Sequence, residues 1–292
     1  MGETFMTAKK KKRLIIFGAV TVFLSGLVFW TAWSNTAVQL NTYTISSGKL
    51  PEAFDGYRIA HISDLHNAEI GNGNENLLAL LRESEPDIIA VTGDLIDSRN
   101  TDVETAISFM KEAVELAPCC YVTGNHEAGT PEYNELKSVL AKLGVNVLAN
   151  ERISLEKDGE EIALIGVDDP SFTSDTLFKE DESVIGSHLQ NLREETDQFT
   201  ILLSHRPELF DVYVENNLNL VLSGHAHGGQ FRLPFVGGII APDQGLFPKY
   251  DAGMYCENNT TMIVSRGIGN SIIPFRVNNR PEVILIELKR AA

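Results

Sequence analysis

From about residue 57 onward, short apolar runs alternate with longer segments in which apolar residues recur at helical spacing. The short runs predict buried strands, and the longer segments predict amphipathic helices. In the first half, strands are expected at 58–62, 87–91, 119–122 and 145–149, and helices at 74–84, 101–116 and 131–144. This regular alternation of strand and helix is typical of an α/β sheet.

After residue 150 the pattern changes, because strands follow one another with fewer helical segments between them. Residues 152–167 contain two strand-like segments around Asp158-Gly159, which is a strong hairpin signal. Further strands are expected at 199–203, 218–222, 261–265 and 282–288. The chain therefore fits a mixed α/β (α+β) domain with two sheets better than one doubly wound sheet.

An uncharged stretch of twenty residues, 14–33, precedes this pattern. A helix of this length spans about 30 Å, the thickness of the hydrocarbon core of a bilayer. Trp30 and Trp33 end the stretch, and the basic run 9–13 before it favours a cytoplasmic N-terminus. A cleaved signal peptide is the alternative, although no clean A-x-A site follows. We expect a cytoplasmic segment at 1–13, a transmembrane anchor at 14–33, a connector at 34–56 and an extracytoplasmic domain at 57–292.

The net charge of −16 is unevenly distributed, since the first 33 residues carry +4 and the rest of the chain carries −20. Such an acidic body argues against nucleic-acid binding, because phosphates are bound mainly by lysine and arginine. The three cysteines, Cys119, Cys120 and Cys256, do not have the spacing of a disulfide framework or of a zinc site. Cysteine is therefore not expected to bind metal here.

Five of the expected strands end in aspartate, asparagine or histidine, several of them beside glycine. The residues are Asp64 and His66 after 58–62, Asp94 after 87–91, Asn125 and His126 after 119–122, His205 after 199–203, and His225 and His227 after 218–222. In α/β folds, functional groups gather at the carboxyl ends of strands because the loops there converge. Each residue alone also fits a turn, a cap or a core histidine. Together they predict a metal site, since imidazole is a common metal ligand.

With these residues, the chain resembles the calcineurin-like metallophosphoesterases, whose pattern is D-x-H, G-D, G-N-H-[DE], H and G-H-x-H. The matching positions are Asp64-Leu65-His66, Gly93-Asp94, Gly124-Asn125-His126-Glu127, His205 and Gly224-His225-Ala226-His227. The resemblance covers roughly residues 57–288. It extends to the membrane-associated bacterial branch of YkuE/YaeI-like proteins through I-S-D-L-H, G-H-A-H-G-G-Q-F-R-L-P, F-P-K-Y-D-A-G-M-Y, S-R-G-I-G-N-S and P-F-R-V-N-N-R-P-E.

This resemblance implies a four-layer αββα sandwich with two mixed β-sheets and two divalent ions per chain. It assigns one ion to Asp64, His66, Asp94 and His227, and the other to Asp94, Asn125, His205 and His225. Imidazole, carboxylate and amide ligands suit Mn, Fe, Zn or Co. The family pattern makes His126 a phosphate-binding group and a proton donor. Glu127 is a candidate to orient the His126 ring, and Arg206 is a candidate phosphate contact.

We therefore expect a phosphoesterase anchored in the bacterial cell membrane, in which hydroxide between the ions attacks a phosphodiester or pyrophosphate bond. The anchor and the apolar segment 231–253, with Phe235 and Phe247, favour an envelope or lipid-linked substrate, and buried packing is the other explanation of that segment. The alternatives are a phosphomonoesterase, a protein phosphatase or a metal-stabilised binding module without catalysis. His61 and His188 match no motif and are expected to be ordinary histidines. No obligate protein partner is inferred.

Overall fold

The buried aliphatic runs form two six-stranded sheets in this computed structural model, which describes residues 7–173, 181–192, 198–270 and 272–291. In spatial order the first sheet contains β1 (Gln39–Ser47), β16 (Glu282–Arg290), β2 (Arg58–Ile62), β3 (Ile88–Thr92), β4 (Cys119–Val122) and β5 (Asn146–Val147). Strands β2 to β5 are parallel, and β16 lies antiparallel to β2. The four parallel strands therefore direct their carboxyl ends to one edge of the sheet.

The second sheet comes from the C-terminal half of the chain. In spatial order it contains β14 (Gly253–Glu257), β15 (Thr260–Val264), β9 (Leu220–Ser223), β8 (Thr200–Leu203), β7 (Glu160–Gly166) and β6 (Glu151–Lys157). The four inner strands are parallel, and each outer strand is antiparallel to its neighbour. Both sheets are mixed, as the sequence analysis predicted.

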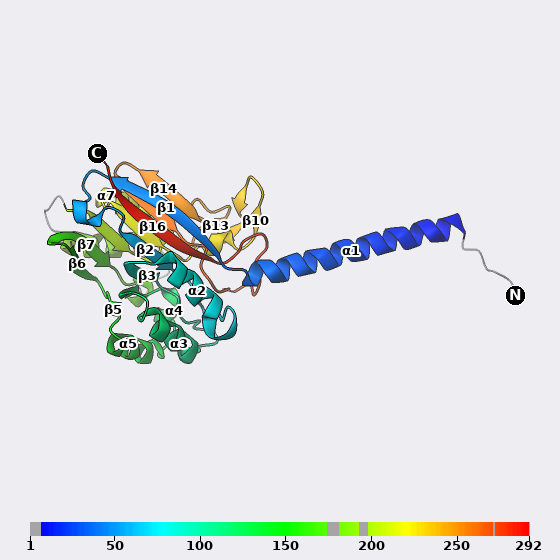
Figure 1. Cartoon of the computed structure of the whole chain (residues 1–292), viewed down its shortest axis with the longest axis horizontal. Coiled ribbons are helices and arrows are strands. Elements are labelled where there is room, and N and C mark those ends of the chain that lie inside the picture. The colour runs from blue at the N-terminus through cyan, green and yellow to red at the C-terminus, as the bar shows by residue number, and fades with distance from the viewer. Residues whose placement is uncertain (1–6, 174–180, 193–197, 271, 292) are drawn as a thin grey trace.

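Apolar side chains join the sheets and helices into four layers (Figure 1). Between the sheets, Ile59 and Ile88 of the first pack with Leu164 and Leu203 of the second. The helices on the outer face of the first sheet are α2 (Glu75–Ser84), α3 (Val103–Ala113) and α5 (Tyr133–Lys142), and those on the second are α6 (Asp181–Leu192) and α7 (Phe210–Glu215). The predicted αββα sandwich is confirmed.

Short helical turns connect the strands and helices. They are η1 (Glu52–Phe54), η2 (Asn72–Asn74), α4 (Asn125–Ala128), η3 (Pro170–Phe172), η4 (Pro207–Leu209) and η5 (His227–Gly229). The apolar segment 231–253 folds into two small hairpins, β10 (Arg232–Leu233) with β11 (Gly237–Gly238) and β12 (Ile240–Ala241) with β13 (Gly245–Leu246). Phe235, Leu246 and Phe247 of this segment are exposed, so buried packing does not explain these three side chains.

The segment 34–56, expected to be a connector, is part of the folded body. Gln39–Ser47 form β1, which pairs in parallel with β16 along its whole length. Ile45, Leu50 and Phe54 are buried in the core between the sheets. The expectation was wrong here because the role of this segment depends on pairing with a strand at the far end of the chain.

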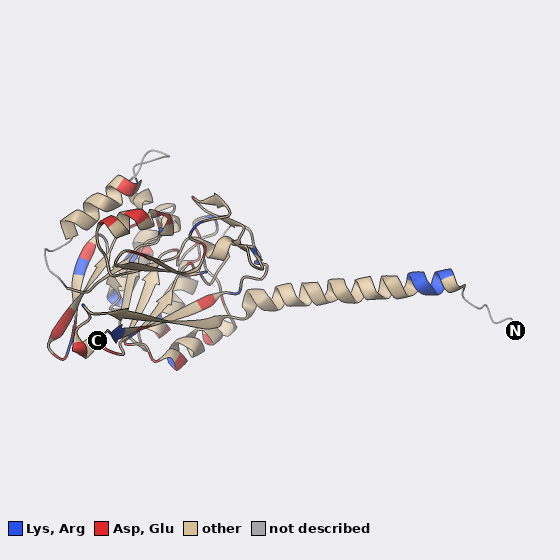
Figure 2. Ribbon diagram, turned by 90° about the horizontal axis from the view of Figure 1, so that it is seen from above, with Lys and Arg blue, Asp and Glu red and all other residues tan. Residues whose placement is uncertain are grey.

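Helix α1 (Ala8–Thr36) extends away from the body and carries basic residues near its free end (Figure 2). Within the described residues, it is the one helix long and apolar enough to cross a membrane. Most of its large apolar side chains between Leu14 and Trp33 are exposed, whereas Ser34 is buried where the helix reaches the body. By length and composition, α1 agrees with the predicted membrane anchor.

Candidate metal centre

Five strand ends from the two sheets meet at one edge of the sandwich. The residues at these ends are Asp64 and His66 after β2, Asp94 after β3, Asn125 and His126 after β4, His205 after β8, and His225 and His227 after β9. Parallel strands present their carboxyl ends on the same side, so residues far apart in the sequence become neighbours. The histidines and aspartates among them form interlocking groups with donor atoms within 4.8 Å of one another.

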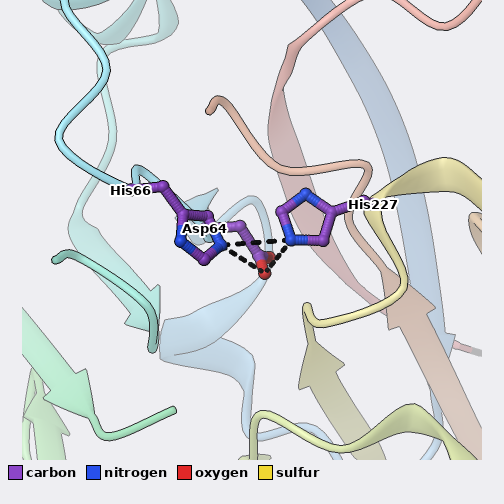
Figure 3. A group of neighbouring side chains, drawn as sticks. All are labelled: Asp64, His66 and His227. Atoms are coloured by element: carbon purple, nitrogen blue, oxygen red, sulfur yellow. Dashed lines mark hydrogen bonds and ion pairs between the residues drawn. The ribbon is translucent and has the colours of Figure 1, made fainter. Parts of the chain in front are cut away.

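The first group consists of Asp64, His66 and His227, whose side chains point toward one another (Figure 3). The Nε2 atoms of His66 and His227 lie 3.1 Å apart. Asp64 Oδ1 lies 3.3 Å from His227 Nε2 and 3.8 Å from His66 Nε2. All three residues are buried, so three donor atoms converge on one point away from solvent.

The second group consists of Asp94, His205 and His225. His205 Nε2 lies 3.2 Å from Asp94 Oδ2 and 3.2 Å from His225 Nδ1. The same oxygen of Asp94 lies 3.4 Å from Nε2 of His66, which belongs to the first group. The two groups therefore share Asp94, in the way that a carboxylate between two ions would be shared.

Asn125 offers one more possible donor, on the loop whose next residue contacts Asp94. The backbone N–H of the next residue, His126, donates to Asp94 Oδ1 at 2.9 Å. Among the described residues, Asn125 Oδ1 is buried and has no hydrogen-bond partner. Leaving a buried amide oxygen unsatisfied costs about 1–3 kcal/mol, and a metal ion would remove this cost. The set of imidazole, carboxylate and amide donors therefore fits divalent ions of the Mn, Fe, Zn and Co class.

The backbone around these donors is unusual. The φ angles are 53° at Asp64, 45° at His66, 52° at Asp94, 64° at His225 and 46° at His227. Such left-handed conformations are uncommon outside glycine, and strained residues of this kind cluster at functional sites. At position 224 there is no space for a side chain, because a Cβ atom on Gly224 would clash with Ser63 Oγ and Asp64 Oδ2.

Within the site, negative carboxylates and positively charged histidines stabilise one another. Burial alone would raise the pKa of Asp94, but His205 and His66 outweigh burial and hold this pKa well below its usual range. Burial would lower the pKa of His205, yet Asp94 raises it to about 10. Burial dominates at His227 and lowers its pKa, so this ring is neutral and can offer a lone pair to a metal.

His126 lies beside both groups without belonging to the predicted ligands. Its ring packs edge-on against His66, with the ring centres 4.5 Å apart. Its Nδ1 accepts a hydrogen bond from the backbone N–H of Ser98 at 3.0 Å. The neutral ring therefore carries its proton on Nε2. Burial lowers the pKa of His126, although Asp94 opposes this shift.

Glu127 organises the loops of the site. Its carboxylate accepts hydrogen bonds from the backbone N–H groups of Gly124 at 2.7 Å, of Asp94 at 2.8 Å and of Leu95 at 2.8 Å. Burial and the nearby charge of Asp94 raise the pKa of Glu127 to about 7. The structure thus places this carboxylate against the backbone, whereas the sequence analysis considered it a group that orients the His126 ring.

Arg206 is buried beside His225, with its Nη1 3.3 Å from His225 Nε2. Its Nε and Nη2 donate to the two oxygens of Asp169, at 2.6 and 2.9 Å. Its Nη1 also donates to Asp243. Most of the donors of this guanidinium are therefore engaged by carboxylates of the protein, and the phosphate contact expected of Arg206 stays a prediction.

Two carboxylates that the sequence analysis missed border the site. Asp243, in the turn between β12 and β13, lies 2.8 Å from His225 Nε2. Asp97 lies 3.5 Å from Nδ1 of His126 and is paired with Arg99. Asp97 stands three residues after Asp94, but nothing in the turn sequence A-P-D-Q-G connects Asp243 with a histidine in another loop.

The two histidines outside the motifs lie outside the groups. His61 is fully buried in β2, with its Nε2 2.7 Å from Thr92 Oγ1, and burial lowers its pKa to about 3. His188 is partly buried on α6. Among the described residues, neither belongs to a group of donors that could hold a metal.

The chain is similar in sequence to known phosphoesterases. The profile of the calcineurin-like phosphoesterase family matches residues 57–229. The chain is 32% identical to the uncharacterized metallophosphoesterase YkuE of Bacillus subtilis, over 86% of each chain. It is 27% identical to the phosphodiesterase YaeI of Escherichia coli, over 80% of this chain and 82% of that one. It is also 27% identical to a transmembrane protein with metallophosphoesterase domain from Bos taurus, over 99% of this chain and 66% of that protein.

Proposed function

The chain belongs to the calcineurin-like phosphoesterase family, and we propose that it is a membrane-anchored enzyme that uses two divalent ions to hydrolyse phosphodiester or pyrophosphate bonds. The observation that carries the proposal is the position of Asp94, whose Oδ2 lies within 3.4 Å of a histidine from each donor group. Sharing of one carboxylate is the arrangement that holds two ions about 3.5–4 Å apart, a separation suited to phosphoryl transfer.

The proposed ligands divide between the two ions. Asp64, His66, Asp94 and His227 would hold one ion, and Asp94, Asn125, His205 and His225 would hold the other. The close donor groups Asp64-His66-His227 and Asp94-His205-His225 support this division. When bound, two such ions stabilise charge on phosphoryl oxygens and lower the pKa of water. The protein contributes rigid geometry, because Glu127 connects the loop of Asp94 with the loop of Asn125 through backbone hydrogen bonds.

His126 is the proposed proton donor to the leaving oxygen. Its support is the hydrogen bond from Ser98 to Nδ1, which leaves the proton of the neutral ring on Nε2. The second support is its position, edge-on to His66 and hydrogen-bonded through its backbone to Asp94. General acids of this kind contribute roughly 10²–10⁴-fold to a rate.

The bond type and the substrate are the finer part of the proposal. Support for a diester comes from the name phosphodiesterase of the relative YaeI. Support for an envelope or lipid-linked substrate comes from α1 and from the exposed Phe235 and Phe247. A phosphomonoesterase or protein phosphatase with the same donors is the alternative.

The membrane orientation is also proposed. The run 9–13 at the free end of α1 is basic, and such runs stay in the cytoplasm by the positive-inside rule. The body, residues 34–292, then lies on the extracytoplasmic side of a bacterial membrane.

The first experiment measures metal content and hydrolysis of bis-p-nitrophenyl phosphate by the detergent-solubilised full chain with added Mn²⁺. We expect about two ions per chain in the parent protein, and loss of turnover together with loss of metal in Asp94→Asn. We expect His126→Ala to retain its metal while kcat falls about 10²–10⁴-fold. His188→Gln, on the surface helix α6, serves as the control for both measurements.

Three other results would change this conclusion. Metal binding without turnover on a wide panel of phosphate esters would favour the non-catalytic binding module. Hydrolysis of p-nitrophenyl phosphate but not of the diester would favour the monoesterase. Absence of bound metal in the parent protein would contradict the two-ion proposal.

A further inference from the structure

An unusual number of large apolar side chains is exposed on two loops near the metal centre. We define the apolar rim as Phe235, Val236, Leu246, Phe247, Ile272 and Phe275, which are all at least 46% exposed. Soluble surfaces rarely gather so many large apolar groups, and such patches mark contacts with membranes or with other proteins. In Figure 1 the hairpins with β10 and β13 lie at the end of the body from which α1 leaves.

The two loops of the apolar rim are held together as one unit. The side-chain amide of Gln230 donates to the carbonyl oxygens of Ile273 and Phe275, at 2.9 and 2.7 Å. The rings of Phe231 and Phe275 pack with their centres 5.5 Å apart. The two loops of the rim are therefore linked to each other by hydrogen bonds and ring packing.

The same unit is attached to the end of α1. Asn35 donates from its side-chain amide to the carbonyl of Arg276 at 2.8 Å, and its Oδ1 accepts the backbone N–H of Arg276 at 2.7 Å. Arg280 lies over the ring of Trp33 at 4.9 Å and donates to the carbonyl of Ala37. These contacts set the position of the rim relative to the helix that is proposed to cross the membrane.

A groove of about 650 Å³ between α1 and the body shows how far along the helix this unit reaches. Leu27 and Val28 of α1 line one wall, and Pro274 and Phe275 line the other. Leu27 lies six residues before Trp33, or about 9 Å along the helix axis. The uncharged stretch 14–33 is only just long enough to cross a bilayer, so in this proposal Leu27 lies below the membrane surface, and Phe275 shares a groove with it.

We propose that the apolar rim inserts into the lipid bilayer beside α1 and holds the metal centre at the membrane surface. Interfacial elements of this kind bury apolar side chains about 5–10 Å into the boundary between headgroups and acyl chains. A second cavity, of about 240 Å³, lies between the rim and the metal centre and is lined by His227, Ile240, Pro242 and Ile272. Because His227 borders this cavity, in this proposal the cavity would take the apolar part of a lipid whose phosphate lies at the metal centre.

The insertion rests on the proposed anchoring by α1 and not on catalysis. The test uses the full chain in phosphatidylcholine–phosphatidylglycerol nanodiscs, in a Cys256→Ser background because Cys119 and Cys120 are buried. The fluorophore NBD is attached at Phe235→Cys or Phe247→Cys in the rim. Phe17→Cys in α1 reports anchoring, and Met254→Cys on β14, half exposed, is the matched surface control.

We expect doxyl-labelled lipid to quench NBD at positions 235, 247 and 17, with iodide quenching severalfold weaker than at position 254. Iodide quenching at 235 and 247 as strong as at 254, with position 17 embedded, would overturn insertion and leave the anchor intact. Position 17 exposed to iodide would overturn the anchor and the insertion together.

A second measurement separates insertion from catalysis. We expect the double variant Phe235→Ser/Phe247→Ser to hydrolyse bis-p-nitrophenyl phosphate like the parent, and to hydrolyse a phosphodiester lipid in the same nanodiscs severalfold more slowly. Equal rates on the lipid would overturn the role of the rim in presenting substrate. A parent protein that is inactive on every ester while its rim is quenched by lipid would contradict the proposed enzyme and support the insertion.

Discussion

At the scale of single residues, His205 and Asp94 show how the protein prepares a metal site. Asp94 raises the pKa of His205 to about 10, so that ring is protonated at neutral pH when it faces only the carboxylate. A metal ion requires the neutral ring, and binding must therefore release that proton. In the metal-free protein, the proton of His205 therefore supplies the positive charge that faces the Asp94 carboxylate. A bound cation would supply that charge instead.

This pairing predicts a pH dependence. Between pH 6 and 8, the affinity for Mn²⁺ should rise about tenfold per pH unit for every proton that metal binding releases. Calorimetry in buffers with different ionisation enthalpies should detect that release. His188→Gln should behave like the parent protein. A binding enthalpy that is independent of the buffer would contradict the prediction.

The same pKa has a consequence for the metal-free fold. A histidine whose pKa is raised in the folded state stabilises the fold fully below its unfolded pKa of about 6.5, and this contribution is lost as the pH rises toward about 10. The thermal midpoint of the metal-free protein should therefore fall across this window. Excess Mn²⁺ should reduce that fall, because the bound ion replaces the proton.

At the scale of elements, the site depends on how closely strand ends of the two sheets approach. The turn after β9 packs directly on the turn after β2, and the backbone N–H of His225 donates to both oxygens of Asp64 at 3.1 Å. Gly224 permits this contact because it has no side chain to meet Ser63 and Asp64. Two sheets thus form one site through a glycine at their point of contact.

Gly224→Ala tests this contact. The new Cβ would meet Ser63 and Asp64, and overpacking of a buried contact costs about 1–3 kcal/mol. We expect a thermal midpoint several degrees lower and loss of at least one of the two ions, measured by differential scanning fluorimetry and metal analysis. Gly48→Ala is the control, since a Cβ atom at that position would meet nothing within 4 Å and its φ is not positive. A variant with unchanged midpoint and metal content would show that the turns can separate without harm.

At the scale of the whole molecule, residues of opposite charge lie on the two sides of the apolar helix α1. The basic residues near the free end of α1 and the acidic body lie on opposite sides of the apolar stretch of the helix (Figure 2). The proposed orientation rests on the basic run alone, because acidic residues contribute little to the positive-inside rule.

Cys256 tests the orientation. It is exposed on β14, whereas Cys119 and Cys120 are buried, so it is the cysteine that a bulky reagent reaches in the folded protein. When the full chain is expressed in Escherichia coli, a membrane-impermeant maleimide should label it in intact spheroplasts. Cys256→Ser should abolish the labelling. Labelling that occurs only after lysis would place the body in the cytoplasm.

The sequence by itself determined the elements whose signals are local. The runs that became β2, β3, β4, β8 and β9 are apolar enough to be recognised as strands without their partners, and the polar residues after them follow directly along the chain. Hydrophobic length likewise identified α1. The resemblance to a family then assigned these residues to two ions. The structure brings Asp64, His66 and His227 together, and Asp94, His205 and His225 together, while the division between two ions stays a prediction.

Only the tertiary structure decided what depends on distant parts of the chain. The segment Gln39–Ser47 became a strand because β16 pairs with it. Asp243 reached His225, and Glu127 turned to the backbone of Asp94, through contacts between separate loops. The rim likewise came together through Gln230 and Asn35. Each of these features rests on pairing between residues far apart in the sequence, and a local pattern carries no record of such pairing.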